Sequence, residues 1–260
     1  MIAIALAWFI PCELIAQDQL GNALASLKAP DWHSRSIGVH EIAEMPIWLN
    51  SPLTKQALLE LLESENDAVT AMFNDPIPES ESEARGNYYS ELLGIVGSFV
   101  ESTDEAGLGV LLRAQYNPDS DFALKLLSYG EPVVRPLLSL VDHPETNERD
   151  HVLRVNAYEM LGYLIKNHRT GKTLHRLSES SIRAIESRLR GGLGDMNVGI
   201  RLAAIRGEAA AGDVEALGIL QELQRTDPDV RVTEAGRRRY LVREAAARAI
   251  ATIRAHPTFR

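Results

Sequence analysis

A short pattern at helical spacing recurs along this chain and constrains its fold more than any other feature of the sequence. It consists of an arginine, a small residue three positions later and a large apolar residue four positions after that, as in Arg243, Ala246 and Ile250. Residues at such spacing lie on one face of an α-helix. A small residue at a fixed place on that face indicates that another helix passes close to it. The pattern therefore predicts helices stacked at one recurrent contact.

Five copies of the pattern are present, and two of them are imperfect. Their arginines are Arg35, Arg85, Arg154, Arg201 and Arg243. In the second copy Tyr88 replaces the small residue, and the fourth copy reaches Glu208 where an apolar residue is expected. The residues four positions before the first four arginines are Asp31, Glu81, Asp150 and Asn197. Because such residues can cap a helix start and pair with an arginine one turn on, we interpret the five arginines as a structural spine.

Between these arginine-bearing first helices lie second helices, which carry Leu, Ile or Val at helical spacing. They are expected at 18–29, 51–64, 105–114, 131–143, 180–193 and 213–225. Residues 121–130 fit a first helix without its arginine, and 240–255 fit a closing first helix. Equivalent arginines lie 50, 69, 47 and 42 residues apart, an irregular period typical of helical-repeat solenoids. We expect an all-α fold of about five helix pairs plus end helices, forming one continuous domain.

Three segments interrupt this alternation of helices. Residues 74–87 begin with several Pro, Ser and Glu residues and are expected to form an exposed acidic loop. Residues 167–180 are expected to form a longer link between paired helices. Residues 231–240 separate "DPDV" from the helix it would normally begin, and they predict a short hairpin or an ordered loop.

The segments "DPDV" and "VREAAARAI", together with "HVLRVNAYEMLGYL", resemble HEAT-type repeats, specifically the bacterial HEAT-like repeats named after phycobilisome lyases. The resemblance covers roughly residues 18–256. It implies a right-handed superhelix whose second helices line a concave face that binds other proteins. Solvent-side residues expected on that face include Lys55, Glu60, Arg135, Arg183, Glu186, Glu215 and Glu222.

The N-terminal region contains an apolar run, Ile2–Ile10, that fits the hydrophobic part of a secretory signal and is too short to span a membrane. Cleavage after Ala16 would leave a mature repeat domain of residues 17–260 without any cysteine, because Cys12 is the single one. A positively charged segment before the run is missing, and an ordinary buried first helix is the alternative. The signal predicts a periplasmic or secreted protein, and its absence a cytoplasmic one.

Charge is distributed unevenly along the chain. Residues 1–180 carry 26 acidic and 13 basic side chains, whereas residues 181–260 carry 10 acidic side chains and 14 arginines. The acidic part disfavours nucleic acid and anionic lipid as partners. Arg237, Arg238 and Arg239 lie in the 231–240 insertion, and at least two of them should reach solvent. They form either a solvated loop paired with Glu234 and Glu244 or a site for an acidic or phosphate-bearing partner.

The residues that would carry catalysis do not form a recognisable constellation. His40 and Glu41 are a single His-Glu pair, whereas deoxyhypusine hydroxylase, which this repeat resembles, uses four such pairs for its iron. A zinc helix would need histidine where Glu44 stands. "RTGKT" (169–173) lacks the first glycine and the preceding strand of a phosphate loop, so it predicts a basic turn.

We therefore expect a non-enzymatic protein-interaction scaffold that needs no metal and no cofactor. Two alternatives stay open at this point. The first is a bilin-lyase-like enzyme or chromophore chaperone, which coloured material in the purified protein would favour. The second is nucleic-acid binding through the C-terminal arginines, which salt-sensitive retention on DNA would favour.

Overall fold

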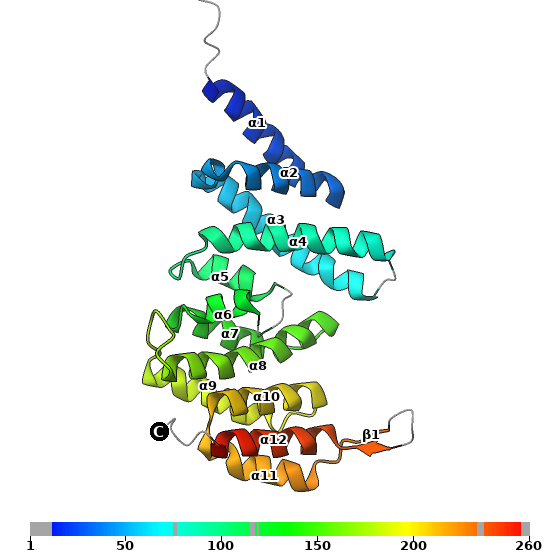
Figure 1. Cartoon of the computed structure of the whole chain (residues 1–260), viewed down its shortest axis with the longest axis vertical. Helices are drawn as coiled ribbons and strands as arrows, with labels where there is room; N and C mark the ends of the chain where they lie inside the picture. The colour runs from blue at the N-terminus through cyan, green and yellow to red at the C-terminus, as the bar shows by residue number, and fades with distance from the viewer. Residues whose placement is uncertain (1–11, 75–76, 115–117, 119, 233–236, 256–260) are drawn as a thin grey trace, which may run out of the picture. The chain divides into compact units, whose positions relative to one another are not determined.

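The computed structural model of the chain describes residues 12–74, 77–114, 118, 120–232 and 237–255. Within these residues the protein is all-helical, with twelve α-helices, two 3₁₀-helices and two strands of two residues each (Figure 1). The predicted all-α class is therefore confirmed. None of the described helices is long and apolar enough to cross a membrane. By its contacts the chain divides into two compact units, Met1–Gln115 and Tyr116–Arg260.

The first unit contains five α-helices and one 3₁₀-helix. These are α1 (Cys12–Leu27), α2 (Trp32–Glu44), η1 (Pro46–Asn50), α3 (Pro52–Asn74), α4 (Glu79–Phe99) and α5 (Glu105–Leu112). Helix α2 packs against α1 and α4, and α3 packs against α1, α4 and α5. At the small position of the pattern, a Cβ on Gly38 would lie 2.7 Å from the carbonyl oxygen of Ala23, so only glycine lets α1 and α2 approach this closely.

Helix α1 continues through the position after Ala16 where cleavage of a signal is predicted. The apolar run Ile2–Ile10 itself lies outside the described residues. The export signal and the cleavage site therefore remain predictions.

The exposed acidic loop predicted at 74–87 is wrong over most of its length, because α4 begins at Glu79. Glu79 and Glu81 lie in the first turn of this helix, where a carboxylate interacts favourably with the helix dipole. Pro78, just before the helix, takes an extended conformation that suits a helix entry. The Ser and Glu residues that predict a loop here belong to the acidic start of a helix.

The second unit contains three closely packed pairs of helices and one shorter helix. Its elements are α6 (Asp121–Leu127), α7 (Glu131–Asp142), α8 (Glu148–Arg169), α9 (Glu179–Gly192), α10 (Val198–Ala211), η2 (Val214–Ala216), α11 (Leu217–Thr226), β1 (Arg231–Val232), β2 (Arg238–Arg239) and α12 (Leu241–Ala255). The first helices α8, α10 and α12 pack in sequence against one another, and α7, α9 and α11 pack against their partners α8, α10 and α12 (Figure 1).

Helices α8 and α10 make the closest backbone approach through two glycines. A Cβ on Gly162 would lie 2.2 Å from the carbonyl oxygen of Gly207, and a Cβ on Gly207 would lie 2.7 Å from the carbonyl oxygen of Tyr158. Both distances are too short for any side chain, so the two helices can cross here only because both residues lack one. The small residue of the sequence pattern on α8, Ala157, is also buried, with 1% of its surface exposed.

The insertion at 231–240 contains an antiparallel hairpin, which is one of the two conformations predicted for it. Arg231 stands opposite Arg239, and Val232 stands opposite Arg238. The residues that join the two strands, 233–236, lie outside the described part of the chain. All four paired residues are exposed.

Candidate functional site

The spine arginines of the second unit are connected through two aspartates. The carboxylate of Asp195 accepts from Arg154 Nη2 at 3.4 Å, and its backbone carbonyl accepts from Arg201 Nη1 at 2.9 Å. Asp227 repeats this arrangement, since its carboxylate accepts from Arg201 Nε at 3.0 Å and its carbonyl accepts from Arg243 Nε at 2.7 Å. Each aspartate therefore joins the arginine of one first helix to the arginine of the next. We call this chain of contacts the arginine–aspartate ladder.

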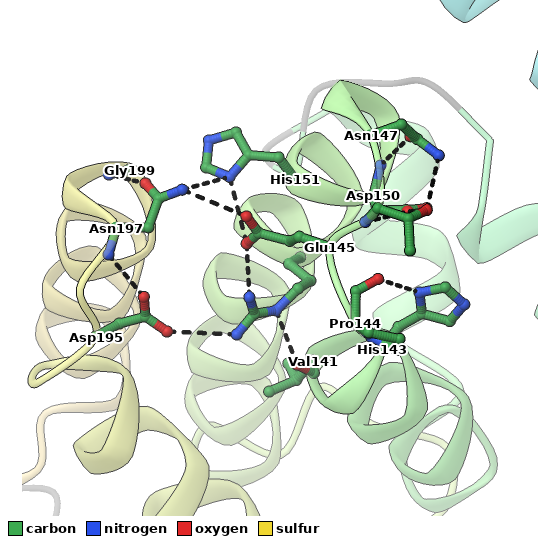
Figure 2. Close-up of polar contacts among 12 residues, drawn as sticks. Val141, His143, Pro144, Glu145, Asn147, Asp150, His151, Asp195, Asn197 and Gly199 are labelled. Carbon is green, nitrogen blue, oxygen red and sulfur yellow. Dashed lines mark hydrogen bonds and ion pairs between the residues drawn. The ribbon is translucent and has the colours of Figure 1, made fainter.

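Figure 2 shows the start of this ladder around Glu145, at the beginning of α8 and α10. Glu145 Oε1 lies 2.6 Å from Arg154 Nη1 and 3.4 Å from His151 Nδ1. Asn197 Nδ2 lies 3.4 Å from Glu145 Oε2, while the side-chain oxygen of Asn197 caps α10 by accepting from the Gly199 N–H at 2.8 Å. These ion pairs and helix caps fix the starts of two neighbouring first helices to each other.

The partners predicted four residues before the arginines are wrong at three of the four positions. Asp31 and Asn197 are N-caps, each accepting from a backbone N–H in its own first turn. Asp150 accepts from Thr146, in the residues that lead into α8. A side chain that caps a helix start points at the free N–H groups and away from the residue four positions on. Glu81 does pair with Arg85, at 3.1 Å, as predicted.

In the first unit, Arg35 makes the same contacts that Arg201 makes in the second. Its Nη1 donates to the carbonyls of Ala29 and Pro30 at 2.9 and 2.8 Å, and its Nε donates to Glu65 Oε1 at 2.7 Å. Arg201 likewise donates to the carbonyls six and five residues before it and to an aspartate 26 residues after it. The same atoms of two arginines thus bind the preceding loop and the following second helix in two separate units.

Arg35 and Arg85 line a cavity of about 270 Å³ in the first unit. The guanidinium of Arg85 lies 5.3 Å from the centre of the Trp32 ring. Tyr88, the exception in the sequence pattern, donates its hydroxyl to Glu65 Oε1 at 3.0 Å, and burial raises the pKa of its phenol, so it stays protonated. Glu65 is only 4% exposed and its charge is met by Arg35. The large side chain at this position therefore completes a buried polar cluster.

The three candidate partner-binding arginines, Arg237, Arg238 and Arg239, are all exposed, as the sequence predicts. Arg239 Nη2 lies 2.5 Å from Glu244 Oε2, so the predicted pairing with Glu244 is confirmed. Glu234 lies outside the described residues. In contrast to these three, Arg243 belongs to the ladder, and its guanidinium lies 4.3 Å from the centre of the Tyr240 ring.

A groove of about 800 Å³ lies between the second helices α3 and α5 of the first unit. Its lining residues are Gln56, Leu59, Glu60 and Glu63 on α3, and Glu105, Ala106, Gly109, Val110 and Arg113 on or next to α5. The α3 residues are spaced as one face of a helix. Glu63 Oε2 lies 2.7 Å from Arg113 Nη2, and Asn66 Nδ2 donates to the carbonyl of Val110 at 3.2 Å, so α3 and α5 are held together beside the groove. The volume lies within the range of ligand-binding clefts.

Apolar and acidic side chains both line the groove, and we call Leu59, Ala106 and Val110 its floor and Glu60, Glu63 and Glu105 its rim. Leu59 and Val110 are half-buried and Ala106 is exposed, so apolar surface faces the open space. Three glutamates and one arginine line it. Residues 1–115 as a whole carry 17 acidic and 5 basic side chains, so the groove belongs to a strongly acidic unit.

Other solvent-side residues expected on the second helices are engaged in ion pairs within the second unit. These pairs are Glu186–Arg169, Glu215–Arg190 and Glu222–Arg225, at 3.0, 2.5 and 2.7 Å. Among the expected residues, Glu60 is the one that lines the α3–α5 groove.

Glu208 is a buried acid that the sequence reveals only as a break in the repeat pattern. Its side chain is fully buried on α10, and neither carboxyl oxygen has a hydrogen-bond partner among the described residues. Burial raises its pKa to about 8, and the negative charge of Asp213 acts in the same direction, against Arg190. At neutral pH the group is therefore mostly protonated.

The remaining chemical motifs of the sequence take structural roles. Helix α8 ends at Arg169, and Gly171, with φ of +69°, turns the chain so that Lys172 N–H donates to the Asn167 carbonyl at 2.8 Å. The predicted basic turn at 169–173 is confirmed, and it follows a helix C-terminus, where the dipole disfavours phosphate. His40 pairs with Glu91 at 3.1 Å. In the described part of the chain no three His, Cys, Asp or Glu residues are arranged to hold a metal ion.

No family model matches the chain, and a search of curated proteins finds no relative. The groove, the ladder and the hairpin are therefore the features on which a function can rest.

Proposed function

We propose that the chain is a HEAT-like repeat solenoid that acts as a non-enzymatic protein-interaction module. Support for the repeat comes from the corresponding contacts of Arg35 and Arg201, each with two preceding carbonyls and one later carboxylate, and from the alternation of first and second helices. The observation that carries the function is the α3–α5 groove, which is open, about 800 Å³ in volume and formed by two second helices. Second helices are the surface on which the resemblance places the partner.

The shape of the groove favours a segment of a protein as its occupant. The α3 stripe from Gln56 to Glu63 spans eight residues, and the seven steps between its ends correspond to about 10 Å along the helix axis. An amphipathic peptide helix can lay its apolar face along a groove between two helices, which is a recurring mode of peptide recognition.

A photo-crosslinking amino acid at two positions tests this proposal. At Gln56 it would face the groove, and at Gly94 it would project from the exposed side of α4, where a Cβ meets nothing within 4 Å. In the native host we expect a covalent protein adduct from position 56 and none from position 94. Equal adducts from both positions, or none from position 56, would contradict the proposal.

We also propose that the protein is exported to the periplasm or secreted. The support is the apolar run Ile2–Ile10 followed by a cleavage site after Ala16. Sequencing the N-terminus of the protein isolated from its host is the test, and Gln17 is the expected first residue. A chain that retains residues 1–16 would show that the segment is not a cleaved signal.

A second surface, the arginine hairpin, favours an acidic partner. Arg231 stands directly opposite Arg239, and like charges at such positions destabilise a hairpin. Glu244 already pairs with Arg239 at 2.5 Å, so the exposed side chains of Arg231 and Arg238 offer the further positive charge of this surface. A carboxylate or phosphate group of a partner would bind at Arg231 and Arg238, since guanidinium groups suit both. The turn of the hairpin is not needed for this argument, since the paired residues themselves are exposed.

Replacing Arg237, Arg238 and Arg239 by alanine tests the hairpin surface. With a fluorescein-labelled oligoglutamate peptide as the probe, we expect affinity to fall at low salt and the difference to shrink at high salt. The melting temperature should stay nearly unchanged, because the three side chains are exposed. Unchanged affinity at low salt would mean that the hairpin is merely solvated, and salt-sensitive retention on DNA would indicate a nucleic-acid site in its place.

A further inference from the structure

We infer that the α3–α5 groove binds a basic amphipathic peptide segment of a partner protein, one in which lysine or arginine flanks large apolar residues. This inference rests on the proposed interaction function and specifies the chemistry of the partner. Three features of the groove carry it: the charge of its rim, the apolar surface of its floor and the space above Gly109.

The charge of the rim selects a cationic occupant. Arg113 is matched by Glu63 at 2.7 Å, so the single arginine of the groove is already neutralised by one of the three glutamates. Glu60 accepts from Gln56 Nε2 at 2.9 Å, and this donor is neutral, so the carboxylate charge of Glu60 is not cancelled by that contact. Glu105 lines the groove from the opposite helix and has an interaction of its own, so the available charge is that of Glu60. A lysine or arginine of the partner would pair with Glu60.

The floor of the groove supplies the apolar half of the recognition. Leu59 on α3 and Val110 on α5 present half-buried side chains to the open space. A Cβ added at Gly109 would meet only Arg113 Nη1, at 3.5 Å, so room for an apolar side chain exists above this residue. Gly107 differs, because a Cβ there would lie 2.5 Å from Asp104 Oδ2, which makes that glycine a requirement of packing. Gly109 keeps the floor open without such a requirement.

The same features exclude other classes of occupant. Carboxylates on both walls repel phosphate and acidic peptides, and the acidic excess of residues 1–115 extends that repulsion around the groove. A metal ion lacks a set of three ligands here among the described residues, whereas an amphipathic peptide uses both surfaces. The arginine hairpin of a second copy is the nearest competitor in chemistry, and the experiment below separates it.

Fluorescence anisotropy with the full chain and two labelled peptides tests the inference. The probe is a 14-residue helical peptide with lysines on one face and leucines on the other, and its counterpart carries glutamate in place of each lysine. We expect the lysine peptide to bind and the glutamate peptide to show no saturable binding. Affinity for the lysine peptide should fall at least tenfold in the double variant Glu60→Lys, Glu105→Lys.

Matched variants separate the groove from general charge attraction. The double variant Glu41→Lys, Glu44→Lys makes the same change in net charge on α2, where both residues are exposed and outside the groove lining. We expect it to change the affinity less than twofold. Gly109→Leu should fill the groove and weaken binding at least fivefold, whereas Gly94→Leu on α4 should not, since both positions accept a Cβ without a close contact. Circular dichroism must show native helix content in each variant.

Several outcomes would overturn the inference. Equal weakening by the α2 charge variant would mean that only bulk charge attracts the peptide, and undiminished binding by Gly109→Leu would place the peptide elsewhere. Concentration-dependent self-association in sedimentation velocity, abolished by Gly109→Leu, would assign the groove to a second copy. A crosslinked partner at position 56 that contacts the groove through an acidic or neutral segment would overturn this inference alone. No adduct and no peptide binding would overturn the proposed function with it.

Discussion

Glu208 is the residue whose surroundings conflict most with the chemistry of its side chain. Its carboxyl group is buried without a hydrogen-bond partner among the described residues, and its pKa is raised to about 8. The charged groups that act on it are Asp213 and Glu186, which raise its pKa, and Arg190 and Arg169, which lower it. These groups come from α8, α9 and the turn after α10, so the second unit surrounds the acid with charge of both signs.

This environment makes the stability of the second unit dependent on pH. An acid whose folded pKa lies above its unfolded value binds a proton on folding, so its neutral form is tolerated below the unfolded pKa of about 4.5. Stability is then lost as the pH rises from about 4.5 to about 8, and the loss levels off above that. For a fully buried group with this shift the total is roughly 3 to 5 kcal/mol.

Glu208→Gln should therefore leave stability nearly unchanged at pH 4 and raise it increasingly between pH 5 and pH 9. The amide resembles the protonated acid in shape but cannot ionise, so the cost of a buried charge disappears. Urea unfolding at several pH values measures the difference. Glu179→Gln, at an exposed position on α9, is the control and should give a flat difference. A parallel pH dependence for the Glu208→Gln variant and the natural chain would show that Glu208 stays ionised or hydrated.

At this scale the sequence predicts helix caps better than long-range partners. Asp31 and Asn197 are recognised as residues of helix starts because capping depends on the few residues that follow. The acids that meet Arg35 and Arg201 lie 30 and 26 residues away, so no local pattern connects them. The anomaly at Glu208 is visible in the sequence, but its burial depends on the packing of α8, α9 and α10.

At the scale of the helices, the crossing of α8 and α10 depends on two glycines that the pattern does not include. Helix propensity alone predicts that glycine to alanine in a helix interior stabilises by about 1 kcal/mol. At Gly162 and Gly207 the added Cβ would lie 2.2 and 2.7 Å from a backbone oxygen. Steric overlap with the backbone of the neighbouring helix therefore opposes the propensity gain at both positions.

We expect Gly162→Ala and Gly207→Ala each to destabilise the protein by roughly 1 to 3 kcal/mol, because the crowded helices must move apart. Gly94→Ala on α4, where a Cβ meets nothing within 4 Å, should have the opposite sign. Thermal unfolding of the three variants measures both effects. A gain in stability for the first two substitutions would mean that α8 and α10 do not cross at these residues.

The sequence predicts the elements well where hydrophobic periodicity is strong and poorly where composition misleads. Each second helix expected from its Leu, Ile and Val spacing contains a helix in the structure. Helix α3 runs ten residues beyond the expected end at Ser64, and α4 begins inside the expected loop. In both places the polar composition does not mark the helix boundary, since Glu65 and Asn66 are buried on α3 and Glu79 and Glu81 lie in the first turn of α4.

At the scale of the whole chain, the division into two units coincides with the longest interval between the arginines of the repeat pattern. Equivalent arginines are separated by 69 residues between Arg85 and Arg154, the longest interval, and the boundary at Gln115 and Tyr116 falls within it. The helices on either side of the boundary, α5 and α6, have 8 and 7 residues. The repeat pattern predicts the order of the helices, but it contains no information on which neighbours share many contacts.

Deleting residues 240–260 should destabilise the second unit and cause aggregation. Helix α12 covers α10 and α11, and repeat units need such a cover at their ends. Leu220, fully buried on α11, should become exposed, as should apolar residues of α10 such as Ile205, whereas Ile219 is already 41% exposed. Light scattering after size-exclusion chromatography is the measurement. A shortened chain that stays monomeric with an unchanged melting temperature would show that α12 is dispensable.

The arginine–aspartate ladder determines which contacts are lost when one of its aspartates is replaced. Arg154 and Arg201 share Asp195, and Arg201 and Arg243 share Asp227. In each case the first arginine binds the carboxylate and the next one binds the backbone carbonyl. Replacing either aspartate by alanine therefore removes the carboxylate contact with the first arginine and keeps the carbonyl contact with the next. Asp227→Ala should therefore free Arg201 from this residue, while Arg243 keeps its carbonyl contact and α12 stays packed on α10 and α11.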